Sequence, residues 1–192
     1  MKKFETLANE INIYTEGLDN IILENSDSDF IQVFLYAESY DDQVILIDNK
    51  KNGVDVKFHF EGTETREVIF RKFVTKRLQR ATVTIKIPIS KKVYVFGETV
   101  DVEAKSLKND LAIYIENGIV KLGSINSNTN LKLYSGNVFA CVKDVNIDVI
   151  SNDGKIKINK NIFKKKFKKL GINTNKKITI NTIKANIFLT SK

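Results

Sequence analysis

The stretch that decides the fold is residues 101–158, DVEAKSLKNDLAIYIENGIVKLGSINSNTNLKLYSGNVFACVKDVNIDVISNDGKIKI. Three of its glycines, Gly118, Gly136 and Gly154, follow one another at intervals of eighteen residues, and each closes an Asn-Gly, Ser-Gly or Asp-Gly dipeptide. Glycine adopts the positive φ that a tight corner needs without steric cost. We therefore interpret these glycines as structural turns that recur at a fixed interval.

Apolar residues occupy the same places in each eighteen-residue unit. Alternation at period two puts such side chains on one face of a strand, so each unit offers at least two short strands. A unit of this kind cannot bury its own apolar face. The columns are Val120, Val138 and Ile156; Leu122, Ala140 and Ile158; and Ile113, Leu131 and Val149, with Val102 and Ala104 one unit earlier.

The equal spacing predicts an all-β fold, a single-stranded β-solenoid of the β-helix type with rungs of about 18 residues, each covering the core of the one before. An antiparallel meander or sandwich is the alternative. Asn117-Gly118 lies between alternating runs in residues 112–122, and this pattern is also typical of a β-hairpin.

The chain of 192 residues is long enough for one domain with its own core. Its 25 Ile and 20 Asn favour strands and turns. We expect a single domain over residues 1–192, with irregular strands in 9–90, regular repeats in 91–158, and a basic cap with the last strands in 159–192. Two segments have helical spacing: 66–80 predicts a basic amphipathic helix or two edge strands, and 161–171 a short helix or a bulging corner that caps the stack.

Few residues offer catalytic or metal-binding chemistry. Cys141 and His59 are the only residues of their kinds, so a disulfide within the chain and a thiolate metal cluster are excluded. Both are interpreted as structural. The carboxylate candidates are Asp27 with Asp29, Asp41 with Asp42, and Asp144 with Asp148 and Asp153. Such carboxylates could hydrolyse a glycoside or bind Ca²⁺, but their Asn, Ser and Gly neighbours favour turns. No catalytic residue, metal ligand or cofactor is therefore assigned.

Charge is concentrated at the C-terminal end. Residues 155–192 carry 12 Lys and no acid, while residues 1–65 carry 5 basic and 14 acidic groups. A lysine-rich segment attracts polyanions, but lysines also protect exposed strand edges. Docking of the basic end against the acidic first third, within one molecule or between neighbours, is a further alternative. The candidate polyanion-binding residues are Lys164, Lys165, Lys166, Lys168 and Lys169.

Nucleic acid is a less favoured ligand for these lysines than other polyanions. Phe163 and Phe167 interleave with the lysines, as in single-strand binding, but the tail lacks Arg and any recognised nucleic-acid motif.

A family resemblance rests on Val83-Thr84-Ile85-Lys86-Ile87-Pro88, Val100-Asp101-Val102, Gly118-Ile119-Val120-Lys121-Leu122, Ser135-Gly136-Asn137-Val138 and Ser151-Asn152-Asp153-Gly154-Lys155-Ile156. These segments resemble the bacterial putative-adhesin family of unknown function. The resemblance covers residues 9–158 and implies a strand-rich first half followed by Gly-centred rungs of a β-solenoid. It implies no catalytic residues. The lysine-rich tail is not part of the pattern.

The function expected from the sequence is a non-catalytic structural or interaction module, similar to an adhesin, that presents a solenoid surface to a protein, a carbohydrate or an anionic surface. The alternatives are polyanion binding through the lysine-rich segment and a carbohydrate-active β-helix enzyme. No window is long and apolar enough to span a membrane, and the first residues lack the apolar run of a signal peptide. This predicts a cytoplasmic protein as the chain is written, or one at the cell surface or in the periplasm if a leader was removed.

Overall fold

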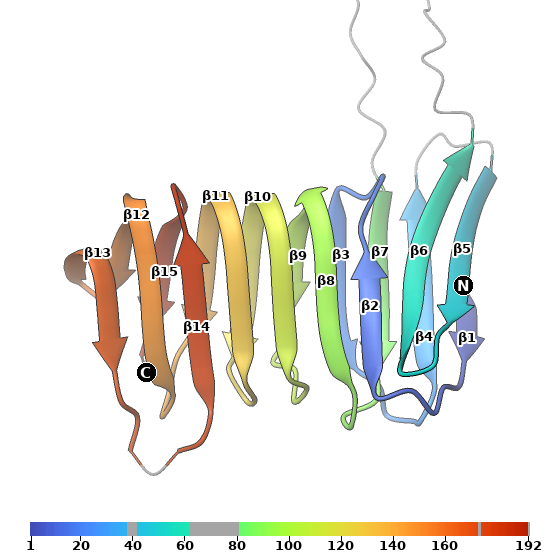
Figure 1. Ribbon diagram of the computed structural model, residues 1–192, viewed down its shortest axis with the longest axis horizontal. Helices are drawn as coiled ribbons and strands as arrows, with labels where there is room; N and C mark the ends of the chain where they lie inside the picture. The colour runs from blue at the N-terminus through green and yellow to red at the C-terminus, as the bar shows by residue number, and fades with distance from the viewer. Residues whose placement is uncertain (38–41, 62–80, 173, 192) are drawn as a thin grey trace, which may run out of the picture.

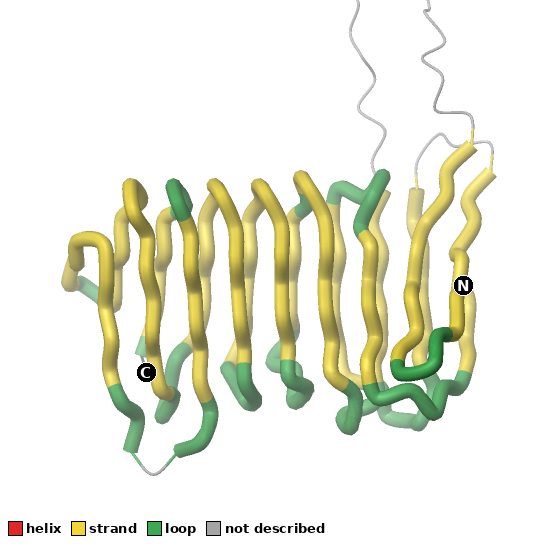
Figure 2. Tube along the Cα trace, viewed as in Figure 1, coloured by secondary structure: helices red, strands yellow, loops and turns green. Residues whose placement is uncertain are grey.

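The computed structural model describes residues 1–37, 42–61, 81–172 and 174–191. The described residues form strands and connecting turns, with no helix among them (Figure 2). The all-β prediction is therefore confirmed. The strands are β1 Lys2–Phe4, β2 Glu10–Tyr14, β3 Asn20–Asn25, β4 Ile31–Ala37, β5 Asp42–Asn49, β6 Gly53–Glu61, β7 Ala81–Ile87, β8 Lys92–Thr99, β9 Asp101–Ala104, β10 Leu111–Ser124, β11 Thr129–Cys141, β12 Asn146–Ile158, β13 Asn161–Lys169, β14 Lys177–Thr182 and β15 Asn186–Thr190.

Strand β10 shows how one eighteen-residue unit is built. Its first half pairs with β8 and its second half with β9, and the chain changes direction between them at Gly118. Figure 2 shows the long strands arching over at one edge, so that each unit contributes to two layers. The front layer contains β5, β6, β2, β8, β14 and the first halves of β10, β11 and β12. The back layer contains β1, β4, β7, β3, β9, β15 and the second halves of those three long strands (Figure 1).

Successive units pair in parallel and in register. Residues of β10 pair with residues eighteen positions later in β11, among them Ile113 with Leu131 and Val120 with Val138. Asn117, proposed above as a possible hairpin turn, lies inside the continuous β10 and pairs with Thr99 and Ser135 on parallel neighbours. The antiparallel meander is therefore wrong for this stretch.

The order of the strands in space differs from their order in the chain. At the C-terminal end, β14 lies between β11 and the first half of β12, and β15 lies between their second halves (Figure 1). At the other end, β2 lies between β6 and β8, and β3 lies between β7 and β9. The predicted column of Val120, Val138 and Ile156 thus needs a correction, because Ile187 of β15 pairs with both Val138 and Ile156 and separates them.

The core lies between the two layers and consists of aligned β-branched and leucine side chains. In the front layer one unbroken column runs through seven strands, and each of its side chains is at most 1% exposed. Full burial of one such side chain contributes about 1.5–3 kcal/mol, so the columns hold the layers together. In spatial order this column is Val56, Ile13, Val95, Ile113, Leu131, Ile180 and Val149.

Antiparallel strands close both ends of the stack. At one end β5 pairs with β6, β4 with β7 and β1 with β4, and at the other end β13 pairs with β12. The helix predicted in 161–171 is therefore wrong, because residues 161–169 form β13. This strand bends where Lys165 has a φ of 59°, and the pairing with β12 shifts register there. The helix or edge strands predicted for 66–80 lie outside the described residues.

All three corner glycines lie against the backbone of a neighbouring segment, and two of them also have an unusual φ. Gly118 and Gly136 have φ values of 151° and 120°, which L residues rarely adopt. Gly154 is not among the described residues with positive φ. A Cβ at Gly154 would overlap the carbonyl oxygen of Ala185, just as a Cβ at Gly118 or Gly136 would overlap that of Val100 or Gly118. Close approach of the backbone therefore excludes a side chain at all three corners.

Candidate binding face

The outer surface of the front layer carries a row of stacked aromatic rings. Tyr14, Phe96 and Tyr114 are register partners on β2, β8 and β10, so their side chains point the same way from neighbouring strands. The ring centroids are 5.4 and 5.5 Å apart, with interplanar angles of 23° and 14°. All three side chains are half-exposed. Centroid distances in this range are typical of offset-stacked aromatic pairs, which stabilise one another.

Lysines end the aromatic row on both sides. The Lys57 ammonium lies 5.3 Å from the centroid of the Tyr14 ring, and the Lys132 ammonium lies 5.7 Å from that of Tyr114. Both distances suit a cation–π interaction, which is worth about 0.5–1 kcal/mol at exposed sites. The row therefore presents aromatic edges to solvent between two positive charges.

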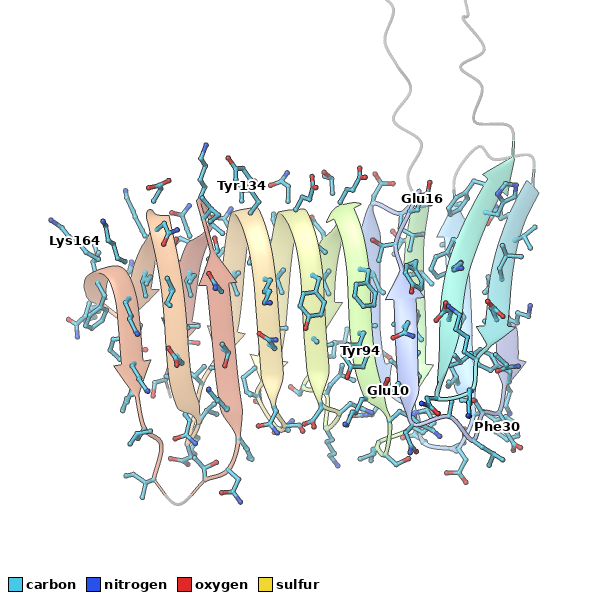
Figure 3. The ribbon with its side chains drawn as sticks, viewed as in Figure 1. Glu10, Glu16, Phe30, Tyr94, Tyr134 and Lys164 are labelled. Atoms are coloured by element: carbon cyan, nitrogen blue, oxygen red, sulfur yellow. The ribbon has the colours of Figure 1, made fainter. Side chains whose placement is uncertain are left out.

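A second row beside the first contains a gap. Its residues Asn12, Tyr94, Ala112, Asn130 and Thr179 are register partners on successive strands of the front layer. The Tyr94 ring is parallel to that of Phe96, at an interplanar angle of 8° and a centroid distance of 6.4 Å. Figure 3 shows Tyr94 on the outer side of the front layer. Ala112 has the shortest side chain in this row and is buried, and it lines a hollow together with Tyr94.

The hollow above Ala112 is an open cavity of about 430 Å³. We call it the Ala112 slot and define it by Tyr94, Ala112, Tyr114, Asn130 and Thr179, all of which line it. Lys92, Asp110 and Lys177 line the same cavity. Aromatic, amide, hydroxyl and charged groups thus meet at one place on the face.

A buried carboxylate lies beside the same two rows. Asp55 on β6 is fully buried, accepts a hydrogen bond of 2.9 Å from the Asn12 side chain and lies 2.5 Å from the Lys50 ammonium. Burial raises the pKa of Asp55, but the hydrogen bonds from Lys50 and Asn12 outweigh burial and leave the pKa below its ordinary value. The same contact raises the pKa of Lys50. This ion pair anchors the β5–β6 turn to the front layer.

The five candidate polyanion-binding lysines all lie on β13, and all are exposed. β13 is the outermost strand at its end of the stack, and Lys164 projects from that end (Figure 3). The structure does not place Phe163 and Phe167 beside the lysines as a stacking platform. Their rings lie 4.5 Å apart, are half-buried and pack against the core.

The acidic and basic ends of the chain lie at opposite ends of the long axis. β1, β4, β5 and β6 are at one end and β13 is at the other (Figure 1). Docking of the basic end against these strands within one molecule is therefore excluded, and docking between neighbouring molecules remains a prediction.

The carboxylate candidates are spread over the described part of the chain. Asp27 and Asp29 lie between β3 and β4, Asp144 lies in the turn before β12, and Asp148 and Asp153 lie in different halves of β12. Asp42 begins β5, and Asp41 lies outside the described residues. Within residues 1–37, 42–61, 81–172 and 174–191, no cluster of three or more His, Cys, Asp or Glu side chains could hold a metal ion.

The remaining reactive side chains are on separate strands. Cys141, at the end of β11, is exposed, and its sulfur lies 3.3 Å from the Thr190 hydroxyl oxygen. His59 is on β6 and pairs in register with Val44 of β5.

The described part of the chain contains no helix that is long and apolar enough to cross a membrane.

Comparison with known proteins shows a likeness of fold. No protein-family model matches the chain, and no curated protein sequence matches it. A putative cell adhesion protein from Clostridium sporogenes aligns with a TM-score of 0.66 at 14% identity, over 100% of this chain and 98% of that one. A putative adhesin from Bacteroides fragilis aligns with a TM-score of 0.38 at 11% identity, over 98% of this chain and 95% of that one. The resemblance to bacterial putative adhesins that the sequence indicated is confirmed as a likeness of fold.

Proposed function

We propose that this protein is a non-catalytic, adhesin-like interaction module that works at a cell surface. In this proposal the chain is one β-solenoid-like domain that presents the outer side of its front layer to a partner. The parallel, in-register pairing of units eighteen residues apart supports the solenoid architecture. The fold likeness to a protein described as a cell adhesion protein supports the role.

The observation that carries the proposal is the row of Tyr14, Phe96 and Tyr114. Half-exposed aromatic rings keep apolar surface in contact with water, which is unfavourable. Such exposed aromatic groups are enriched at the surfaces through which proteins bind partners. Their conformational freedom is already reduced by stacking, so binding to them loses little further side-chain entropy. The row is continuous with the Ala112 slot, which offers polar groups for specificity.

An adhesion assay on defined surfaces tests this function. Beads coated with the protein are applied to arrays of immobilised glycans and purified extracellular-matrix proteins, and retention is measured under flow. The front variant is Tyr14→Ala with Tyr114→Ala. The matched control is Phe139→Ala with Phe188→Ala, which removes a stacked pair with a centroid distance of 4.9 Å from the back layer.

The proposal expects retention by the wild type and by the back-layer control, and at least tenfold weaker retention by the front variant. Equal retention of the front variant, or hydrolysis of a retained glycan, would contradict it.

Polyanion binding through β13 is a second candidate function. Its support is the exposure of Lys164, Lys165, Lys166, Lys168 and Lys169 on one terminal strand. Binding of this kind releases counterions and weakens steeply with salt. The five-site Lys→Gln variant should lose retention on heparin. A control that changes five exposed lysines elsewhere, Lys51, Lys108, Lys121, Lys143 and Lys176, should keep most of it. Equal loss in both variants would reduce the effect to net charge and contradict a site on β13.

A further inference from the structure

The Ala112 slot is a place on the front layer where a planar group could join a series of parallel rings. In its row the neighbours of Ala112 are Tyr94 on β8 and Asn130 on β11. In the adjacent row, each of the three neighbouring strands β2, β8 and β10 carries a stacked ring. The rings of Tyr94, Phe96 and Tyr114 are nearly parallel to one another. The face of the Tyr94 ring is therefore directed along the stack, over Ala112.

The width of the slot fits one ring. Tyr94 and Asn130 are two strand spacings apart, which is about 9.4–9.8 Å. Carbon atoms in contact lie about 3.5–4.0 Å apart. One ring in contact with both walls needs the walls to be two contact distances apart, about 7–8 Å. Two stacked rings would need three contact distances, about 10.5–12 Å. The slot thus admits a single ring, edge first.

Polar groups line part of the slot, beside the apolar Val93, Leu111 and Ala112. Asn130 lies on the strand that flanks Ala112 on the side away from Tyr94, and its amide donates a long hydrogen bond, of 3.5 Å, to the Tyr114 hydroxyl. A bond of that length is weak, so the amide can exchange it for a ligand hydroxyl. Thr179 adds a hydroxyl and Asp110 a carboxylate to the lining, while Lys92 and Lys177 add two exposed ammonium groups.

We infer that the Ala112 slot binds one pyranose ring of a glycan. A pyranose has an apolar C–H face, which packs on the Tyr94 ring, and hydroxyl groups around its edge, which meet the amide, hydroxyl and carboxylate groups of the rim. Lys92 and Lys177 favour a pyranose that carries a carboxylate. This inference rests on the proposed function and names the ligand class for the front layer.

Titration with simple sugars tests the inference. Methyl β-D-glucopyranoside and methyl β-D-glucopyranosiduronate are added to the ¹⁵N-labelled protein, and amide shifts and Kd are measured by NMR. Ala112→Phe fills the gap with a ring of the protein's own, and Tyr94→Ala removes the stacking wall. Ile119→Phe is the matched control, because Ile119 is half-buried on the second half of β10, in the back layer.

The inference expects shifts at Ala112, Asn130 and Thr179, and a several-fold lower Kd for the uronate than for the neutral sugar. Ala112→Phe and Tyr94→Ala should each raise Kd at least tenfold, and Ala112→Phe should leave the melting temperature unchanged. The control Ile119→Phe should leave Kd unchanged. Unaltered binding by Ala112→Phe, or binding of adenosine in place of either sugar, would overturn it. If neither sugar binds but the front variant still adheres more weakly than the wild type, only this inference is overturned. If the front variant adheres as strongly as the wild type, the proposed function itself is overturned.

Discussion

Gly118 and Gly136 are register partners at the corners of two consecutive units, and the backbone of one leaves no room for a side chain on the other. A Cβ on Gly136 would overlap the carbonyl oxygen of Gly118. The φ of Gly136, 120°, is also one that L residues rarely adopt. The corner is therefore a stack of backbone on backbone, and it sets how closely the units approach.

Replacement of Gly136 by alanine should destabilise the protein by at least about 2 kcal/mol, because it adds both steric overlap and an unfavourable φ. Urea unfolding followed by circular dichroism measures the change. Gly53→Ala is the control, since its backbone lacks a positive φ and a Cβ there would approach its nearest neighbours no closer than 3.4 Å. Similar losses in the two variants would argue against a special requirement at the corner.

Asn109 joins three segments through one buried amide. It donates to the carbonyl oxygens of Pro88 at 2.7 Å and Lys91 at 2.7 Å, and it accepts a bond of 2.6 Å from the Asn25 side chain. Asn109→Ala removes all of these bonds around one buried side chain and should cost about 2–3 kcal/mol in the free energy of unfolding. Asn152→Ala, at an exposed corner, should cost under about 0.5 kcal/mol. A small loss for Asn109→Ala would show that water replaces the amide.

Asp55 should make stability depend on pH in the acid range. Its folded pKa is lowered below the ordinary value of 3.8, so its ion pair contributes stability that is fully present above that value and is lost as the pH falls through the folded pKa. The stability difference between wild type and Asp55→Asn should therefore be constant at neutral pH and shrink as the pH falls below about 4. Urea midpoints of both proteins between pH 2 and pH 7 measure it, and a difference that grows on acidification would contradict the assignment.

The terminal strands should differ in hydrogen exchange. β15 is near the end of the chain but pairs with a strand on each side, whereas β13 pairs only with β12 among the described strands. Amides of β15 should therefore exchange as slowly as those of β11, and those of β13 should exchange much faster. Mass-spectrometric exchange of the intact protein reports both. Fast exchange in β15 would indicate that the chain end frays and is not inserted in the stack.

The sequence predicted the repeating part of this fold because one period governs both backbone and side chains. Val120 and Val138 occupy the same place in successive units and are register partners in the structure. Hydrogen bonds between side chains and backbone follow the same spacing: the Ile119 amide donates to Asp101, and the Ser124 amide donates to Ser106. A period in the sequence thus predicts contacts correctly wherever units that follow one another in the chain also lie side by side in space.

The insertion of the terminal strands was beyond that reasoning. Ile187 fits the column between Val138 and Ile156 as well as any other β-branched residue would, and its distance along the chain does not indicate its place. An apolar pattern specifies that a strand has a buried face but does not select which strand covers it.

The helix predicted at 161–171 failed for a physical reason. Phe163 and Phe167 are four residues apart, and four is close to the period of a helix but is also a multiple of the strand period of two. Both side chains share the inner face of β13. Leu170, which the helix would also have buried, is 74% exposed.

The candidate binding face was missed, although part of its signal was present. Phe96 and Tyr114 are eighteen residues apart and outward-facing, which would have predicted two stacked rings. Tyr94, Ala112 and Asn130 follow the same eighteen-residue spacing, so this part of the slot could also have been predicted. Tyr14 and Thr179 could not, because β2 and β14 reach their places by insertion beside β8 and β11.

Inter-strand NOEs test the central structural claim most directly. The account predicts backbone NOEs from β15 around Ile187 to β11 around Val138 and to β12 around Ile156. No backbone NOE should join Val138 to Ile156, because two strand spacings, together about 9.4–9.8 Å, separate them. Backbone NOEs that connect Val138 directly to Ile156, or an antiparallel NOE pattern between β10 and β11, would contradict it.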